Sequence, residues 1–239
     1  LEESYTDIEN LINISFMPKK LVPKASLKLQ EGCDNLNYSC SEVPRWYKYD
    51  SDGKGFKQSM TETLIPKFLE NGGTLLSDCE VTKIISKNNN NSVKVKLKTG
   101  EIKEYFAEFV FVATGAINTP HLLSKSGFKR NIGNTLKLHP TFKFIALFDE
   151  EVNGVGMGVH VHQVKEFSPK ISMGCSISTK GMLAVGLNDC NNSVYLKDWK
   201  NMSTYYSMIC PEGVGSIKNV PFFNDPLVSF SMTNNDYKN

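Results

Sequence analysis

The sequence lacks the features that mark several classes of protein. No apolar run approaches the roughly 20 residues that a membrane-spanning helix requires. Neither sign of charge dominates, because 27 Lys and Arg stand against 25 Asp and Glu. The formal net charge of +2 is too small to favour nucleic acid or an anionic membrane surface as a partner. The opening residues, Leu1-Glu2-Glu3-Ser4, are acidic and polar, unlike the start of a signal peptide.

No two of the six cysteines form a C-x-x-C pair, which removes support for zinc-ribbon and thioredoxin-type sites. A chain of 239 residues, 40% of them hydrophobic, is long enough to build a core without disulfides. Scattered reduced thiols are therefore favoured over a disulfide framework, which favours a cytoplasmic location without establishing the compartment. The cysteines are Cys33, Cys40, Cys79, Cys175, Cys190 and Cys210.

The first third of the chain is predicted to be helical with one long loop. An apolar stripe predicts a helix over 5–12, and a second helix begins just after Pro23. Residues 44–55 form the predicted loop. Ser59-Met60-Thr61-Glu62 is typical of a capping box, but Pro66 requires that the following helix either start later or bend.

After Gly72-Gly73 the apolar residues recur at every second position instead of with a helical period, which predicts strands. We expect strands over 74–77, 80–86, 93–97 and 102–106. The strand over 93–97 should have one apolar face and one solvent-exposed, charged face. The continuous apolar run Phe109–Ala113 is typical of a strand that is buried on both faces.

From Leu136 onward, alternating apolar residues predict a mostly antiparallel sheet. One helix is expected through 196–209, and 227–232 is the last predicted strand. The fold class is therefore α+β or α/β.

A strand followed by Thr114-Gly115 and a helix is the most informative local pattern. Glycine at the end of a buried strand allows close approach of a ligand to the backbone, and the helix start offers free N–H groups. From the residues alone, a simple strand–turn–helix unit without a ligand is favoured over a ligand site.

The residues after this strand resemble the second signature of the glucose–methanol–choline (GMC) oxidoreductases, although Phe128-Lys129 departs from the family pattern. Segments at 57–73, 80–84 and 133–140 are similar to further parts of the family, in the same order. The matching signature is Gly115-Ala116-x-x-Thr119-Pro120-x-Leu122-Leu123-x-x-Ser126-Gly127.

This resemblance implies FAD as the cofactor and an alcohol as the small-molecule substrate. It implies that residues 57–140 form part of an FAD-binding domain, of the FAD/NAD(P)-binding type. Residues 1–56 and 141–239 would then belong to an antiparallel-sheet substrate domain. The implied FAD contacts are Val81, Ala113, Thr114, Gly115 and Ala116.

The resemblance also implies that essential parts of the enzyme lie outside this chain. The chain opens without Met and ends in a polar tail, so we expect it to be an internal fragment. It contains no Gly-x-Gly-x-x-Gly turn after a strand, and Gly154-x-Gly156-x-Gly158 does not replace it. No residue matches the family's catalytic histidine. The fragment alone should therefore bind FAD poorly and catalyse nothing.

Two rival functions are a flavin-dependent reductase or ketosteroid-type dehydrogenase, and a non-enzymatic β-rich binding domain. His160 and His162 have the spacing of a metal pair on a strand, but structural or solvent-facing roles are favoured because no further ligand is evident nearby. The same holds for His121 and His139. The aromatic residues of 46–56 suit either a substrate channel or, preferentially, packing between domains.

Overall fold

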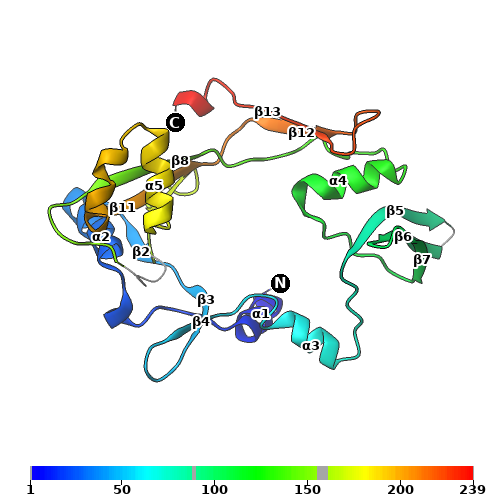
Figure 1. The fold of residues 1–239 in the computed structure, drawn as a ribbon, viewed down its shortest axis with the longest axis horizontal. Coiled ribbons are helices and arrows are strands. Elements are labelled where there is room, and N and C mark those ends of the chain that lie inside the picture. The colour runs from blue at the N-terminus through cyan, green and yellow to red at the C-terminus, as the bar shows by residue number, and fades with distance from the viewer. Residues whose placement is uncertain (1, 88–89, 155–160, 239) are drawn as a thin grey trace. The chain divides into compact units, whose positions relative to one another are not determined.

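The structure is a computed structural model that describes residues 2–87, 90–154 and 161–238 (Figure 1). It contains helices and antiparallel sheets, which confirms the mixed α and β composition expected from the sequence. The chain forms two compact units. Unit 1 comprises Leu1–Thr74 and Pro140–Cys210, and unit 2 comprises Leu75–His139 and Pro211–Asn239. The boundary at His139–Pro140 lies at the end of the segment that the resemblance assigns to the FAD domain.

Unit 1 is built on a five-stranded antiparallel sheet with the order β2-β9-β10-β11-β8. Every described neighbour pair in this sheet is antiparallel. The strands are β2 (Cys40–Glu42), β8 (Thr141–Leu147), β9 (His162–Val164), β10 (Ile171–Cys175) and β11 (Met202–Ile209).

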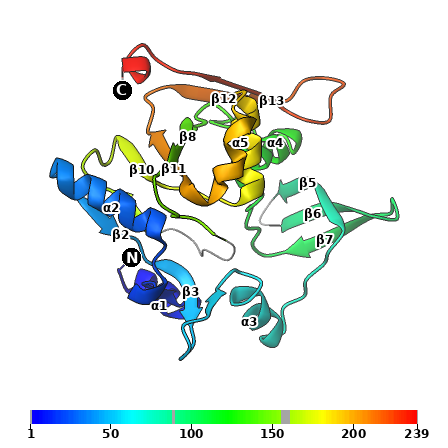
Figure 2. The ribbon, with the colours of Figure 1, turned by 60° about the vertical axis from the view of Figure 1, so that its left-hand side comes forward.

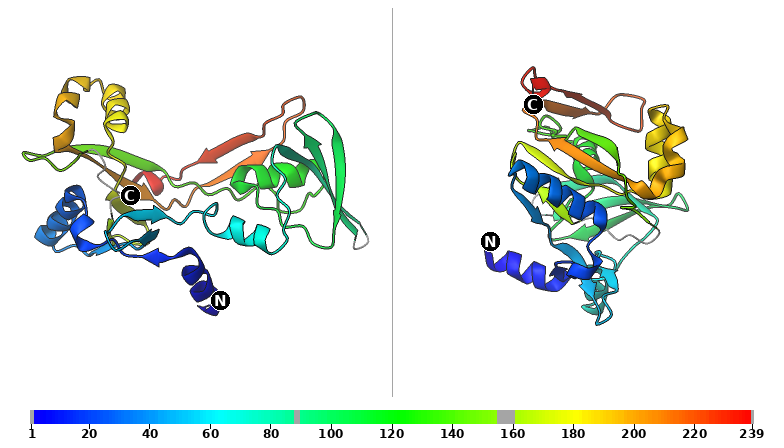
Figure 3. Two further views of the ribbon diagram at one scale, coloured as in Figure 1. Left: turned by 60° about the horizontal axis from the view of Figure 1, so that its bottom comes forward. Right: turned by 90° about the vertical axis from the view of Figure 1, so that its left-hand side faces the viewer.

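The strand β11 is covered on both faces. Its side chains at positions an odd number apart, such as Met202 and Tyr205, point to opposite sides of the sheet. Met202 packs in a core cluster with Leu183 of the helix α5 (Lys180–Asp189) and beside the 3-10 helix η2 (Ser193–Asn201). Tyr205 points the other way, and its hydroxyl donates to the carbonyl of Ala25 at 2.9 Å. Ala25 lies in α2 (Lys24–Leu36), on the opposite side of the sheet from α5 (Figure 3).

The remaining elements of unit 1 lie before or shortly after β2 in the sequence. A small sheet has the order β1-β3-β4. None of the helices in the described ranges has both the length and the apolar character needed to cross a bilayer. These elements are α1 (Glu2–Ile12), β1 (Ile14–Ser15), η1 (Lys19–Leu21), β3 (Arg45–Tyr49), β4 (Gly55–Lys57) and α3 (Leu64–Glu70).

Unit 2 contains an antiparallel meander, one helix and a hairpin (Figure 2). The meander has the order β5-β6-β7, and the helix α4 packs against both β5 and β12. The elements are β5 (Cys79–Lys87), β6 (Asn90–Leu97), β7 (Ile102–Ala107), α4 (Gly115–Lys125), β12 (Val214–Lys218), β13 (Leu227–Ser231) and η3 (Asp236–Lys238).

Elements with a strong local signal are confirmed. The apolar stripe at 5–12 is α1, the helix after Pro23 is α2, and the helix after Thr114 is α4. Helix α3 begins at Leu64 rather than at Ser59, so Pro66 falls in its first turn, where its missing N–H costs nothing. The predicted capping box does not form, since the Ser59 hydroxyl contacts Thr61 Oγ1 instead.

Two predictions about unit 1 were wrong. Residues 202–209 form the strand β11 and not the end of a helix, because burial on both faces removes the period of two from the sequence. The loop predicted at 44–55 contains β3 and the start of β4, which pair as a hairpin. Its turn is closed by Asp50, whose Oδ1 accepts from the N–H groups of Asp52 and Lys54 at 3.1 and 2.8 Å.

Two further predicted strands, Phe109–Ala113 in unit 2 and Thr74–Ser77 at the boundary between the units, do not form. The first of these predictions assumed burial, yet Phe109 is 70% exposed and Phe111 is 93% exposed. No strand in the described part of the chain pairs with either segment through its backbone, and a strand needs such a partner to satisfy its own backbone groups. The run therefore keeps its apolar side chains on the surface.

Candidate functional site

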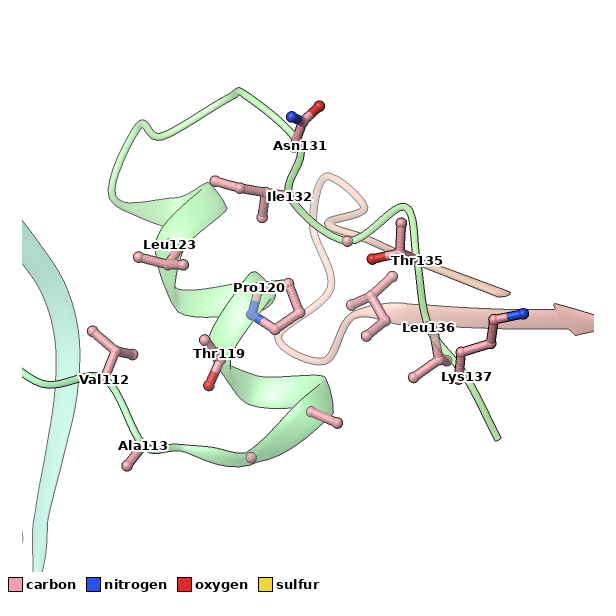
Figure 4. Close-up of a pocket in the computed structure, with 14 residues that line it drawn as sticks. Val112, Ala113, Thr119, Pro120, Leu123, Asn131, Ile132, Thr135, Leu136 and Lys137 are labelled. Atoms are coloured by element: carbon pink, nitrogen blue, oxygen red, sulfur yellow. The ribbon is translucent and has the colours of Figure 1, made fainter. Parts of the chain in front are cut away.

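A groove of about 670 Å³ lies in unit 2 where the apolar run meets α4 (Figure 4). Val112 and Ala113 of the apolar run line it, together with residues of α4 from Gly115 to Leu123. The loop 131–137 and Ile217 of β12 close the opposite side. The groove therefore combines a chain corner, a helix start and a hairpin edge within one unit.

Gly115 is the point at which the backbone turns from the apolar run into α4. Its φ of +90° is in a region that side-chain-bearing residues rarely adopt, so the turn requires glycine. A Cβ atom built on Gly115 would have no neighbour within 4 Å. The glycine is thus needed for conformation and not to avoid a clash inside the chain, and the space beside its backbone is open.

The first turn of α4 presents backbone groups that the helix itself does not use. Thr114 is the N-cap, but its side chain makes no capping hydrogen bond and instead lies 3.0 Å from Thr119 Oγ1. The N–H groups at the start of the helix are therefore without a side-chain cap. Pro120 has no N–H, so the carbonyl of Ala116 loses its i+4 helical donor. The start of α4 therefore offers backbone N–H donors and one carbonyl acceptor, that of Ala116, at the groove.

The other end of α4 explains the last two residues of the signature. Ser126 Oγ donates to Leu122 O at 2.7 Å and accepts from Ile84 N of β5 at 2.8 Å, which ties the helix to the meander. Gly127 has a φ of +94°. The bonds Gly127 N to Ser124 O and Phe128 N to Leu123 O, both 3.1 Å, form a Schellman motif that ends the helix.

The opposite wall is anchored by Leu136, which is buried and pairs with Gly215 of β12 through two backbone hydrogen bonds of 3.1 and 2.7 Å. The next residue, Lys137, also lines the groove. Its Nζ donates to the carbonyls of Glu212 and Gly213 at 2.8 and 2.9 Å and to that of Pro211 at 3.4 Å. The lysine therefore holds the segment before β12 against the loop.

The same segment is fixed from its N–H side by Asp236, which is buried. Its carboxylate accepts from the backbone N–H groups of Glu212, Gly213 and Thr233 at 2.7, 3.1 and 2.7 Å. Burial by itself raises the pKa of Asp236, but these hydrogen bonds stabilise the charged form and hold the pKa below its ordinary value. Lys137 and Asp236 thus hold the carbonyl groups and the N–H groups, respectively, of the segment that leads into β12, beside the groove.

The residues that the sequence named for the site are only partly brought together. Ala113, Gly115 and Ala116 line the groove, and Thr114 lies between them as the N-cap. Val81 lies in β5, half-buried, and is not among the lining residues.

Sequence reasoning missed Thr119 and Lys137 as lining residues. Thr119 stands inside the signature, which is a local signal that points to it. Lys137 acts through carbonyls more than 70 positions away, so no local pattern identifies it.

The histidines and cysteines add no metal centre. No group of three or more His, Cys, Asp or Glu side chains in the described ranges is arranged to hold a metal ion. His160 and the glycines at 156 and 158 lie outside the described residues, while His162 lies half-buried in β9. All six cysteines are free.

Comparison with known proteins adds an independent line of observation. The sequence profile of the family described as GMC oxidoreductase matches residues 2–141. An uncharacterized GMC-type oxidoreductase, y4nJ of Sinorhizobium fredii, is 35% identical over 253 aligned positions, which cover 99% of this chain and 50% of that protein. The long-chain-alcohol oxidase FAO4A of Arabidopsis thaliana is 33% identical over 140 positions, covering 52% of this chain and 19% of that protein.

A third relative is the uncharacterized GMC-type oxidoreductase Rv0492c of Mycobacterium tuberculosis. It is 22% identical over 234 positions, which cover 90% of this chain and 36% of that protein. The chain thus spans half or less of the length of each of these curated relatives.

Proposed function

Since the chain belongs to the GMC oxidoreductase family, we propose that it forms part of an FAD-dependent enzyme that oxidises an alcohol to an aldehyde or ketone. The groove at Gly115 is proposed to hold the adenosine half of FAD. The proposed contacts are Ala113, Thr114, Gly115 and Ala116, with Val81 as a further contact from β5.

The observation that supports this proposal most directly is the backbone at Gly115. The turn is left-handed, the space beside it is open, and the helix start that follows has no side-chain cap. A nucleotide offers hydroxyl groups and ring nitrogens that can pair with the N–H groups of the helix start and with the carbonyl of Ala116, which lacks its i+4 helical donor. The residues present therefore fit this cofactor half.

FAD, when bound, would accept a hydride from the alcohol carbon. In this proposal the chain's own residues bind and orient the nucleotide. Thr114 and Thr119 hold the corner, while Leu136, Lys137 and Asp236 fix the opposite wall. None of the described residues that line the groove is a histidine or carboxylate that could act as a base on the alcohol. No residue of the groove is therefore proposed as the catalytic base, and the resemblance to the family implies that the catalytic histidine lies outside the chain.

The domain assignment is part of the same proposal. Residues 57–140 are assigned to the FAD domain, and residues 1–56 and 141–239 to the substrate domain. The compact units divide the chain differently, since residues 211–239 pack with residues 75–139 and contribute to the groove. Family membership argues against the two rivals, a different flavoprotein class and a β-rich binding domain. Because several plant relatives are named long-chain-alcohol oxidases, long-chain alcohols are the first substrates to test.

The test is purification of the intact polypeptide and of the 239-residue chain side by side. The intact protein should carry FAD in about equimolar amount, and its flavin absorbance should bleach when a long-chain alcohol is added without oxygen. The shorter chain should carry little FAD and oxidise nothing. An intact protein that is colourless after reconstitution with FAD would contradict the proposal.

A further inference from the structure

One face of β3 carries a row of three half-buried polar side chains, Arg45, Tyr47 and Tyr49. The residues between them, Trp46 and Lys48, are exposed, as the period of a strand requires. The row therefore faces the interior of unit 1. It is unusual because an interior strand face normally carries apolar residues.

Two members of this row have buried polar atoms that make no hydrogen bond. Arg45 Nε and Tyr49 Oη are shielded from solvent and have no partner among the described residues, and the same is true of His162 Nδ1 in β9. Buried polar atoms in native proteins are nearly always paired, since leaving one unpaired costs roughly 1–3 kcal/mol. All three residues lie within the electrostatic influence of Glu42, so a single partner outside the described residues could serve more than one of these atoms.

The three residues share an electrostatic neighbourhood. Burial lowers the pKa of Arg45, while Tyr49, Tyr47, Cys175 and Glu42 act in the opposite direction. Burial also lowers the pKa of His162, an effect that Glu42 partly offsets. Glu42 lies opposite His162 in the pairing of β2 with β9. Arg45 and His162 are thus linked through the same carboxylate.

Glu42 does not neutralise the guanidinium. No ion pair in the described part of the chain involves Arg45, and Glu42 Oε1 accepts instead from the backbone N–H of Met17 at 3.2 Å. Arginine remains charged at any physiological pH. The result is a half-buried cation with an unused donor, close to the Tyr49 hydroxyl, which is also unpaired among the described residues.

The aromatic members of the row form a fixed wall. The rings of Tyr47 and Tyr49 are stacked, with centroids 6.0 Å apart and planes inclined by 24°. They lie over Gly55 of β4, where a Cβ atom would come within 2.9 Å of both rings. The hairpin of β3 and β4 therefore holds the rings in place with an apolar surface next to the cation.

We infer that Arg45, Tyr49 and His162 bind the carboxylate of a small alkyl or aryl monocarboxylate. A carboxylate supplies oxygen acceptors for Arg45 Nε–H and the Tyr49 hydroxyl, and a single negative charge balances the single guanidinium. A dianion such as phosphate would carry surplus negative charge into the field of Glu42. The tyrosine rings provide the contact surface for the apolar part of the ligand. This site goes beyond the proposed flavin function and does not depend on it.

The test is calorimetric titration of the intact protein with benzoate and octanoate, and with inorganic phosphate at matched ionic strength. Saturable binding of a monocarboxylate, weakened about tenfold or more by Arg45→Met, is expected because a charge-assisted hydrogen bond is lost. Lys48→Met is the matched control, since it removes a positive charge from the exposed face of the same strand and should leave the affinity unchanged. Tyr49→Phe should weaken binding to a smaller extent.

Folding of the variants is checked by thermal unfolding without ligand. Arg45→Met should melt no lower than the wild type, because it removes a buried charge that has no partner. Absence of saturable monocarboxylate binding would overturn the inference, as would equal affinity in Arg45→Met. Preferential binding of phosphate would overturn the assignment of the ligand class. The measurement is made on protein with and without flavin, so its failure is separate from failure of the proposed function.

Discussion

His121 Nδ1 of α4 lies 2.5 Å from Asn219 Oδ1, at the end of β12, and Asn219 Nδ2 donates to the backbone carbonyl of His121 at 3.3 Å. Because the amide oxygen only accepts, the imidazole must carry its proton on Nδ1. This reciprocal pair fixes the signature helix to the hairpin that forms the far side of the groove.

Breaking this pair should destabilise unit 2. Asn219→Ala removes two hydrogen bonds and should lower the free energy of unfolding by about 1–2 kcal/mol, measured by urea denaturation. Asn224→Ala, on the exposed connection of the same hairpin, is the control and should change stability little. Equal stability of wild type and Asn219→Ala would show that the pair contributes nothing to holding α4.

Acid should weaken the base of the hairpin through Asp236. Backbone hydrogen bonds hold its pKa below the ordinary value in the folded state. A depressed folded pKa contributes stability above the unfolded value of about 4, and that contribution is lost as the pH falls towards the folded pKa.

Asp236→Asn removes the charged acceptor. It should destabilise the chain at neutral pH, and the difference from the wild type should shrink as the pH falls below about 4, where the stability contributed by the charged carboxylate is progressively lost. Thermal unfolding of both proteins across this window provides the measurement. A difference in melting temperature that stays the same from neutral to acidic pH would contradict the account.

We propose that the rest of the intact polypeptide covers the exposed apolar run at Phe109–Ala113. Phe111→Ser should therefore reduce the binding of a hydrophobic dye by the 239-residue chain, where this side chain is exposed. In the intact protein the same change should cost about 3 kcal/mol or more, as for other truncations of buried phenylalanine.

Phe222→Ser is the control for this experiment, because Phe222 is fully exposed in the connection between β12 and β13. It should not alter the stability of the intact protein. If Phe111→Ser is equally harmless there, the run is not buried by the rest of the polypeptide.

The sequence predicted elements whose signal is local. Pro23 sets the start of α2, the alternation from 93 to 97 identifies β6, and Gly127 ends α4. It failed where pairing over long sequence separation decides the outcome. β11 is a strand because it is paired along both edges, by β8 and β10, and Phe109–Ala113 is not a strand because no described strand pairs with it.

The candidate site divides in the same way. Gly115 and Ala116 were identified because glycine at a strand–helix corner has a conformational reason that the sequence shows. Lys137 and Asn219 were not, since their roles depend on partners about 75 to 100 positions away. The unpaired Arg45 was likewise invisible, because β3 was interpreted as a loop and its inward face could not be recognised.

The central claim is that the backbone at Gly115 contacts the flavin nucleotide, and a comparison of two glycines tests it most directly. Gly115 and Gly127 lie at opposite ends of the same helix, both have positive φ, and a Cβ atom at either would have no neighbour within 4 Å. Valine at either position therefore carries similar backbone strain, of about 1–3 kcal/mol. Of the two, Gly115 alone lines the groove.

The measurement is the affinity of the intact apoprotein for FAD, by fluorescence quenching, in Gly115→Val and Gly127→Val. We predict that Gly115→Val weakens FAD binding about tenfold or more, the loss expected for one or two hydrogen bonds, while Gly127→Val binds FAD like the wild type. Equal affinities in the two variants, whether both retained or both lost, would contradict a flavin contact at Gly115.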